Sequence, residues 1–167
     1  MEVKTLIKTS LLHARGMTDK ILDELASPED WLHRASPGGN HALWIAGHLQ
    51  LVDLRALTFI GVESQLDLKQ QAIQFGRGSV PQDSIAPSTE PALLREQLKT
   101  SRSRLLEALD SLTNEDFDKP ASPEAPPFMP TVGMVFQMVL WHEAMHSGQL
   151  TIIHRQLGHP PVAGRPA

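Results

Sequence analysis

Residues Thr131–Leu157 have the sequence TVGMVFQMVLWHEAMHSGQLTIIHRQL and form the most regular segment of the 167-residue chain. Their apolar side chains recur every three or four residues, as the buried stripe of a helix requires. Gly158 and Pro160 follow and would end the helix. Two histidines, His142 and His146, interrupt the apolar stripe. The segment therefore predicts one long helix whose buried face carries two imidazoles.

Three other segments repeat apolar residues with the period of a helix: about Val3–Leu25, Asn40–Ile60 and Ser88–Leu112. In the first of them, the buried stripe is assigned to Leu6, Leu12, Met17, Ile21 and Leu25. No segment shows the two-residue alternation that is typical of a half-buried strand. The sequence therefore predicts an all-α protein with four main helices.

The connection between the second and third helices is unusually long. Residues Val62 to Ser88 contain Gly76, Gly78 and Pro81 and show only a weak apolar pattern. A tight turn between neighbouring helices needs far fewer residues, which favours a crossover connection or a loop that covers an active site. The predicted architecture is a four-helix bundle with a long crossover loop between helices 2 and 3, in a single domain over residues 1–167.

Composition excludes several functions. The formal net charge is −4 with neutral histidines, which argues against a nucleic-acid partner, because such binding relies on many Lys and Arg side chains facing phosphates. The chain has no cysteine, so disulfides, cysteine-held metal clusters and thiol nucleophiles are excluded. No apolar run approaches the roughly 20 residues that span a bilayer, and the N-terminus lacks the apolar core of a signal peptide. We therefore expect a cytoplasmic protein with no membrane partner.

The motif H-E-x-x-H occurs at His142-Glu143-Ala144-Met145-His146. Two histidines one helical turn apart can share a metal ion, or each can be satisfied by neighbouring hydrogen-bond partners. In a zinc protease Glu143 would be the general base, but those enzymes need a third protein ligand downstream. No Asp or Glu follows Glu143, and His154 does not have the required spacing. The motif therefore favours a metal site over a protease.

His48 is the best candidate for the third ligand. It lies in the middle of an apolar face, with Trp44 and Val52 one turn away on either side. If the second and fourth helices are neighbours, His48 completes a three-histidine site with one position left open, as in catalytic rather than structural zinc sites. Such a set suits zinc, nickel, cobalt, manganese or ferrous iron.

Other residues near the motif have more than one interpretation. Glu143 could reach metal-bound water, or it could face a neighbouring side chain or solvent. Gln149 follows His146 by three residues and is a candidate for orienting a ligand or hydrogen-bonding substrate. A di-iron bundle would need Glu-x-x-His twice, and no second copy occurs. The remaining five histidines are expected at the surface or in loops: His13, His33, His41, His154 and His159.

Two segments resemble the DinB/YfiT-like superfamily of small metal-binding four-helix proteins. Residues 43–49, LWIAGHL, carry the histidine in mid-helix, and residues 141–150, WHEAMHSGQL, resemble the family's H-x-x-x-H-x-G-Q signature. With the long middle crossover, the resemblance spans essentially the whole chain. It implies a divalent metal held by His48, His142 and His146, often a homodimer, and a Gly148 that lets helices approach closely.

The resemblance also implies a class of activity. Characterised relatives include thiol transferases, which join a low-molecular-weight thiol to an electrophile, and a thiol-dependent maleylpyruvate isomerase. We therefore expect a metal-dependent thiol S-transferase acting on a small-molecule substrate, with Arg55 as a candidate to hold a carboxylate of the thiol. A metal-dependent hydrolase and a non-catalytic metal-binding stress-response bundle are the alternatives.

Overall fold

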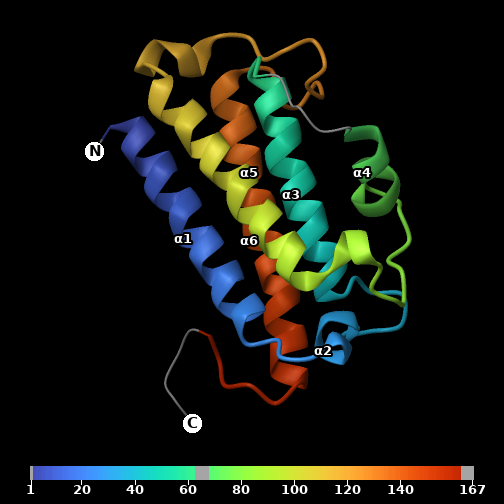
Figure 1. The fold of residues 1–167 in the computed structure, drawn as a ribbon. Coiled ribbons are helices and arrows are strands. Elements are labelled where there is room, and N and C mark those ends of the chain that lie inside the picture. Colours follow the sequence, from blue (N-terminus) through green and yellow to red (C-terminus); the bar gives the residue numbers. More distant parts are fainter. Residues whose placement is uncertain (1, 63–67, 163–167) are drawn as a thin grey trace.

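Four long helices form the bundle in the computed structural model, which describes residues 2–62 and 68–162 (Figure 1). The described part contains helices and two short 3₁₀ turns but no strand, only an isolated bridge between Pro120 and Thr131. The predicted all-α four-helix bundle is confirmed. Its bundle helices are α1 (Val3–Asp23), α3 (Ala42–Phe59), α5 (Pro91–Ser111) and α6 (Val132–Gln156).

Helix α3 is the central element of the fold. It packs against α5, α6, α4 and the short α2 (Pro28–Leu32), and 14 of its 18 residues are buried. His41 begins the helix, because its ring Nδ1 accepts a hydrogen bond from the main-chain N–H of Trp44 at 3.0 Å. His41 was expected at the surface or in a loop; it lies in the loop that precedes α3 and is only 1% exposed. Since α3 and α6 are neighbours, the condition for a three-histidine site is met.

The long crossover contains a helix that the sequence pattern did not predict. Helix α4 (Leu68–Phe75) lies on the outer side of α3 (Figure 1), and residues 63–67 of the crossover lie outside the described ranges. Phe75 packs directly on Gly47 of α3, where an added Cβ would lie 2.5 Å from the phenyl ring. Gly47 therefore provides the space that lets α4 dock.

Helix α1 buries only part of the predicted stripe: Ile21 and, just beyond the helix, Leu25 are buried as expected. Leu6 and Leu12 are about half exposed, at 55% and 51%, whereas Arg15 and Thr18 are buried. Because these two polar residues occupy inward positions, the apolar pattern assigned Leu6 and Leu12 to the wrong face. The predicted stripe of α1 is therefore wrong for Leu6 and Leu12 and confirmed for Ile21 and Leu25.

The apolar core is divided in two by a polar layer. One apolar cluster includes Ile21, Leu98 and Leu150, and the other includes Leu11, Leu105 and Val139. Between them on each bundle helix lies at least one buried polar or charged residue. None of the described helices is both long enough and apolar enough to cross a membrane.

Candidate metal centre

The three predicted ligands meet where α3 packs on α6. His48 comes from α3, and His142 and His146 lie one turn apart on α6. The ring centroids are 4.9, 4.9 and 4.5 Å apart, and one nitrogen from each ring lies within 4.8 Å of the others. The structure thus brings together the three residues that the sequence selected.

Hydrogen bonds fix two of the rings in the orientation that a metal needs. His48 Nδ1 lies 2.6 Å from the main-chain oxygen of Phe75, and His146 Nδ1 lies 2.8 Å from Gln149 Oε1. Both oxygens only accept, so each Nδ1 carries the proton and each Nε2 keeps its lone pair. This arrangement, in which a metal-ligating histidine donates its other N–H to an oxygen, is typical of metal sites.

The spacing of the nitrogens fits a small divalent cation. Nε2 of His48 and Nε2 of His142 are 3.2 Å apart. Two nitrogens bound at about 2.0–2.1 Å to a tetrahedral zinc ion would be about 3.3 Å apart. The ring planes are inclined to one another by 48°, 71° and 65°, so that their lone pairs approach from different directions. The donor set therefore fits a metal with three protein ligands.

Burial keeps these imidazoles neutral. Burial lowers the pKa of His48 to about 4, because its effect is larger than that of the hydrogen bond to Phe75, which raises the pKa. Burial, together with the neighbouring His146 and His48, lowers the pKa of His142 to about 3. Burial also lowers the pKa of His146. Neutral imidazole is the form that binds metal, so no proton has to be displaced near neutral pH.

Glu143, the middle residue of H-E-x-x-H, lies among charged neighbours instead of facing the metal position. Its carboxylate is fully buried, accepts from Arg15 Nε at 2.6 Å through one oxygen, and accepts from Arg102 at 2.5 Å through the other. To act as a base it would have to leave both arginines. Glu143 was expected either to reach metal-bound water or to face a neighbouring side chain or solvent. The structure shows it bound to neighbouring side chains.

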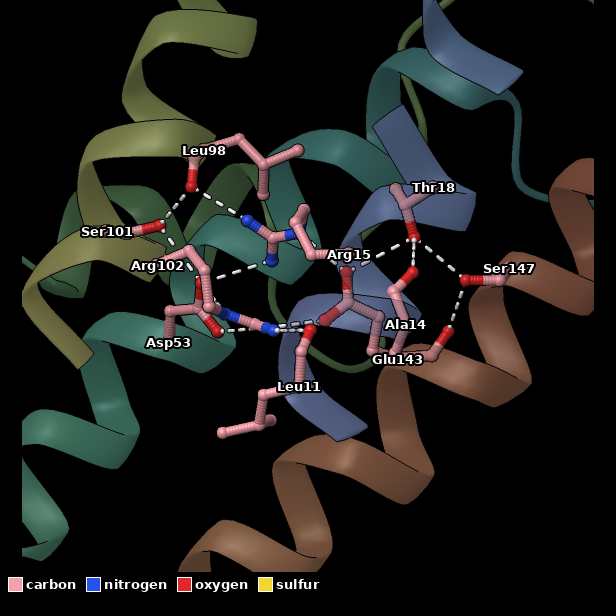
Figure 2. Close-up of polar contacts among 10 residues, drawn as sticks. All are labelled: Leu11, Ala14, Arg15, Thr18, Asp53, Leu98, Ser101, Arg102, Glu143 and Ser147. Atoms are coloured by element: carbon pink, nitrogen blue, oxygen red, sulfur yellow. Dashed lines mark hydrogen bonds and ion pairs between the residues drawn. The ribbon is translucent and has the colours of Figure 1, made fainter. Parts of the chain in front are cut away.

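Asp53 completes this buried cluster, which we call the four-charge cluster: Arg15, Asp53, Arg102 and Glu143. Figure 2 shows the carboxylates of Asp53 and Glu143 bridged by both guanidinium groups, with one member from each bundle helix. Burial alone would raise the pKa of Asp53, but Arg102 and Arg15 outweigh it, so that the pKa is lowered. No sequence pattern predicted this cluster. Its only signal was charged residues at inward helical positions.

A large cavity opens beside the three histidines. Its volume is about 900 Å³, and all three rings line it. Trp44 stacks on His48, with ring centroids 4.5 Å apart and planes 14° apart. Arg55 also lines the cavity, seven residues beyond His48 on α3. The predicted ligands and Arg55 therefore share one cavity, whereas Glu143 is not among its lining residues.

A second group of potential ligands, Glu24, His154 and His159, lacks the geometry of the first. His154 Nε2 donates to Glu24 at 2.7 Å, and the rings of His154 and His159 stack with planes only 12° apart. Lone pairs of parallel rings do not converge, so these side chains form a hydrogen-bonded link between α1 and the end of α6. His154 is 1% exposed, and the expectation that it lies at the surface is wrong.

Comparison with known proteins supports the assignment of fold and family. A family model described as the DinB superfamily matches residues 10–150. A crystal structure described as a conserved protein of locus from Enterococcus faecalis is similar, with a TM-score of 0.66 and 18% sequence identity over 93% of this chain and 96% of that one. At that identity the likeness shows the fold alone. No curated protein matches the chain.

Proposed function

The chain belongs to the DinB superfamily, and from this premise we propose that it is a divalent-metal-dependent enzyme which joins a low-molecular-weight thiol to an electrophilic small molecule. One observation carries the proposal. Three neutral histidines present nitrogens to a single point at the wall of a cavity of about 900 Å³. Three protein ligands leave a coordination position open for a substrate atom, as in catalytic metal sites.

The proposed reaction needs no general base from the chain. When bound at His48, His142 and His146, the metal would act as a Lewis acid that lowers the pKa of a thiol. The thiol proton leaves to solvent, the sulfur lone pair forms the new S–C bond, and the leaving group departs with the electron pair of the bond it breaks. The products are a thioether, the leaving group and a proton. The chain has no cysteine, so the sulfur comes from a substrate.

Two further residues have proposed roles at this site. Gln149 is a positioning residue, because its side-chain oxygen accepts from His146 Nδ1 and so directs Nε2 of that ring. Arg55 lies seven residues beyond His48 on α3 and lines the cavity, which supports a role in holding a carboxylate of the thiol. We also propose the cytoplasm as its location, where small thiols are kept reduced.

A hydrolase would use the same open position for water. Water is a weaker acid than a thiol, so a hydrolase usually has a general base that removes a proton from the bound water. Among the described residues that line the cavity there is no Asp or Glu, and Glu143 is held by two arginines. This supports thiol transfer over hydrolysis.

The test combines metal content with activity. Protein purified without a metal-affinity tag is expected to contain about one divalent metal per chain by elemental analysis. His48→Ala should lose most of that metal and the transfer activity found in a thiol-by-electrophile screen, whereas the exposed His13→Ala should lose neither. Unchanged metal content in His48→Ala would reject the three-histidine site. Full metal content without transfer in any thiol–electrophile pair would favour a non-catalytic bundle.

We propose a homodimer as the assembly. A groove between α1 and α6 is lined by small residues including Ala144 and Gly148, and a Cβ added to Gly148 would meet nothing within 4 Å. Among the described residues of one chain, no helix makes the close approach expected at Gly148, and a second copy of α1 or α6 would supply it. Leu6 and Ile152 lie exposed along the same two helices. Light scattering should give twice the monomer mass, and Ala144→Arg should give the monomer.

A further inference from the structure

The cavity beside the three histidines has an unusually apolar rim. Phe128 and Trp141 line it and yet remain 61% and 60% exposed, and Met145 is exposed beside them. Large apolar side chains gathered at a concave surface mark a site that contacts another apolar molecule. The substrate that enters here is therefore expected to have a substantial apolar body.

The charges of the cavity all have one sign. Two arginines, Arg55 and Arg77, line it, and no lining residue within the described ranges is an acid. Composition does not explain this, because the chain has 19 acidic residues and only 15 basic ones. Within residues 2–62 and 68–162, neither arginine has an ion pair or a side-chain hydrogen bond. A cavity with apolar walls and unpaired cations attracts anions.

The two arginines reach the cavity from different segments of the chain. Arg55 lies seven residues further along α3, which is about 10 Å along the helix axis. Arg77 follows Phe75, whose carbonyl binds His48, and precedes Ser79, which accepts from the indole N–H of Trp44, four residues before His48. Arg55 thus belongs to the C-terminal part of α3, and Arg77 belongs to a segment that packs beside its N-terminal half.

We propose that the electrophile is an apolar molecule that carries an anionic group such as a carboxylate, and that Arg77 binds this group. The inference rests on the proposed thiol transfer for the identity of the two substrates. With Arg55 assigned to the thiol, Arg77 is the cation left for the second substrate. A guanidinium that pairs with a carboxylate in an apolar cavity discriminates strongly against a neutral ligand of the same shape.

The test uses three probes with the same ring system: 2-naphthoate, the neutral 2-naphthalenemethanol and the cationic 2-naphthylmethylammonium. Their affinities are measured by isothermal titration with metal-free protein, so that a carboxylate cannot bind the metal instead of arginine. We expect naphthoate to bind about tenfold more tightly than the alcohol, and the ammonium to bind weakest. Arg77→Gln should remove the advantage of naphthoate without changing the affinity for the alcohol, and Arg77→Lys should keep part of it.

Two further variants, Arg155→Gln and Arg55→Gln, show whether an effect on naphthoate binding is specific to Arg77. Arg155→Gln removes an exposed arginine outside the cavity and should leave all three affinities unchanged. Equal binding of naphthoate and the alcohol, or an effect of Arg77→Gln no larger than that of Arg155→Gln, would overturn the proposal. An effect confined to Arg55→Gln would move the anion site to Arg55. Because the assay needs neither metal nor thiol, naphthoate binding that persists without any thiol transfer would refute the proposed function and leave the anion site standing.

Discussion

Two hydrogen bonds to oxygen atoms determine which ring nitrogen of His48 and of His146 is available to bind a metal. The carbonyl of Phe75 and the side chain of Gln149 each take up one Nδ1–H, which leaves Nε2 of His48 and of His146 to face the metal position. Nδ1 of His142 is buried and has no hydrogen-bond partner in the part of the chain that the structure describes. The orientation of two of the three ligands is thus set by the protein before any metal binds.

Replacing Gln149 tests this arrangement. In Gln149→Ala the ring of His146 loses the acceptor that fixes its orientation, so the metal affinity should fall by about 10–100-fold, although the metal can still bind. Competition with a chromogenic chelator measures the change. Gln137→Ala, at an exposed position of the same helix, is the matched control and should leave the affinity unchanged. Equal affinities in the two variants would remove Gln149 from the site.

At the scale of helices, the sequence predicted α3 and α6, which supply the three histidine side chains. It did not predict α4, which supplies the main-chain oxygen of Phe75. The ranges of α3 and α6 and their histidines followed from apolar periodicity. Helix α4 is only eight residues long, and its single buried side chain is Phe75. Its contribution to the site is a carbonyl oxygen, which every residue carries and no sequence pattern marks. Gly47, in the middle of α3, marks the position where α4 docks.

A methyl group at Gly47 should separate α4 from α3. The added Cβ would lie 2.5 Å from the ring of Phe75, so Gly47→Ala must displace that ring and the carbonyl that holds His48. We expect a loss of about 1–3 kcal/mol in unfolding free energy and weaker metal binding, measured by urea unfolding and chelator competition. Gly16→Ala, where a Cβ meets nothing within 4 Å, should stabilise its helix instead. Similar stability changes in both variants would contradict this account of Gly47.

At the scale of the whole molecule, the four-charge cluster ties all four bundle helices together between the two apolar clusters. Sequence patterns could not reveal it, because a charged residue at one inward position gives no information about its partners on other helices. The same limitation left the role of Glu143 open. Spacing within H-E-x-x-H does not say which of its residues face α3 and which face α1 and α5.

Glu143→Gln distinguishes a structural glutamate from a catalytic base. Removing one carboxylate leaves two buried arginines with a single acidic partner, so the free energy of unfolding of the metal-free protein should fall by about 3 kcal/mol. Urea unfolding measures it. A general base would behave differently: the variant would keep its stability and lose only activity. Unchanged stability would therefore contradict the structural role and favour Glu143 as a catalytic base.

The same cluster sets the acid stability of the fold. Arg102 and Arg15 hold the pKa of Asp53 below its ordinary value of 3.8, despite burial, so the unfolded chain takes up a proton at a higher pH than the folded protein does. The contribution of Asp53 is complete above about pH 4 and is lost as the pH falls through the lowered pKa of the folded state. Urea unfolding between pH 6 and pH 2 should show this fall in the wild type. Asp53→Asn should start less stable and show a flatter profile, whereas the exposed Asp118→Asn should follow the wild type. An unchanged slope in Asp53→Asn would mean that the acid sensitivity of the fold has its origin outside the four-charge cluster.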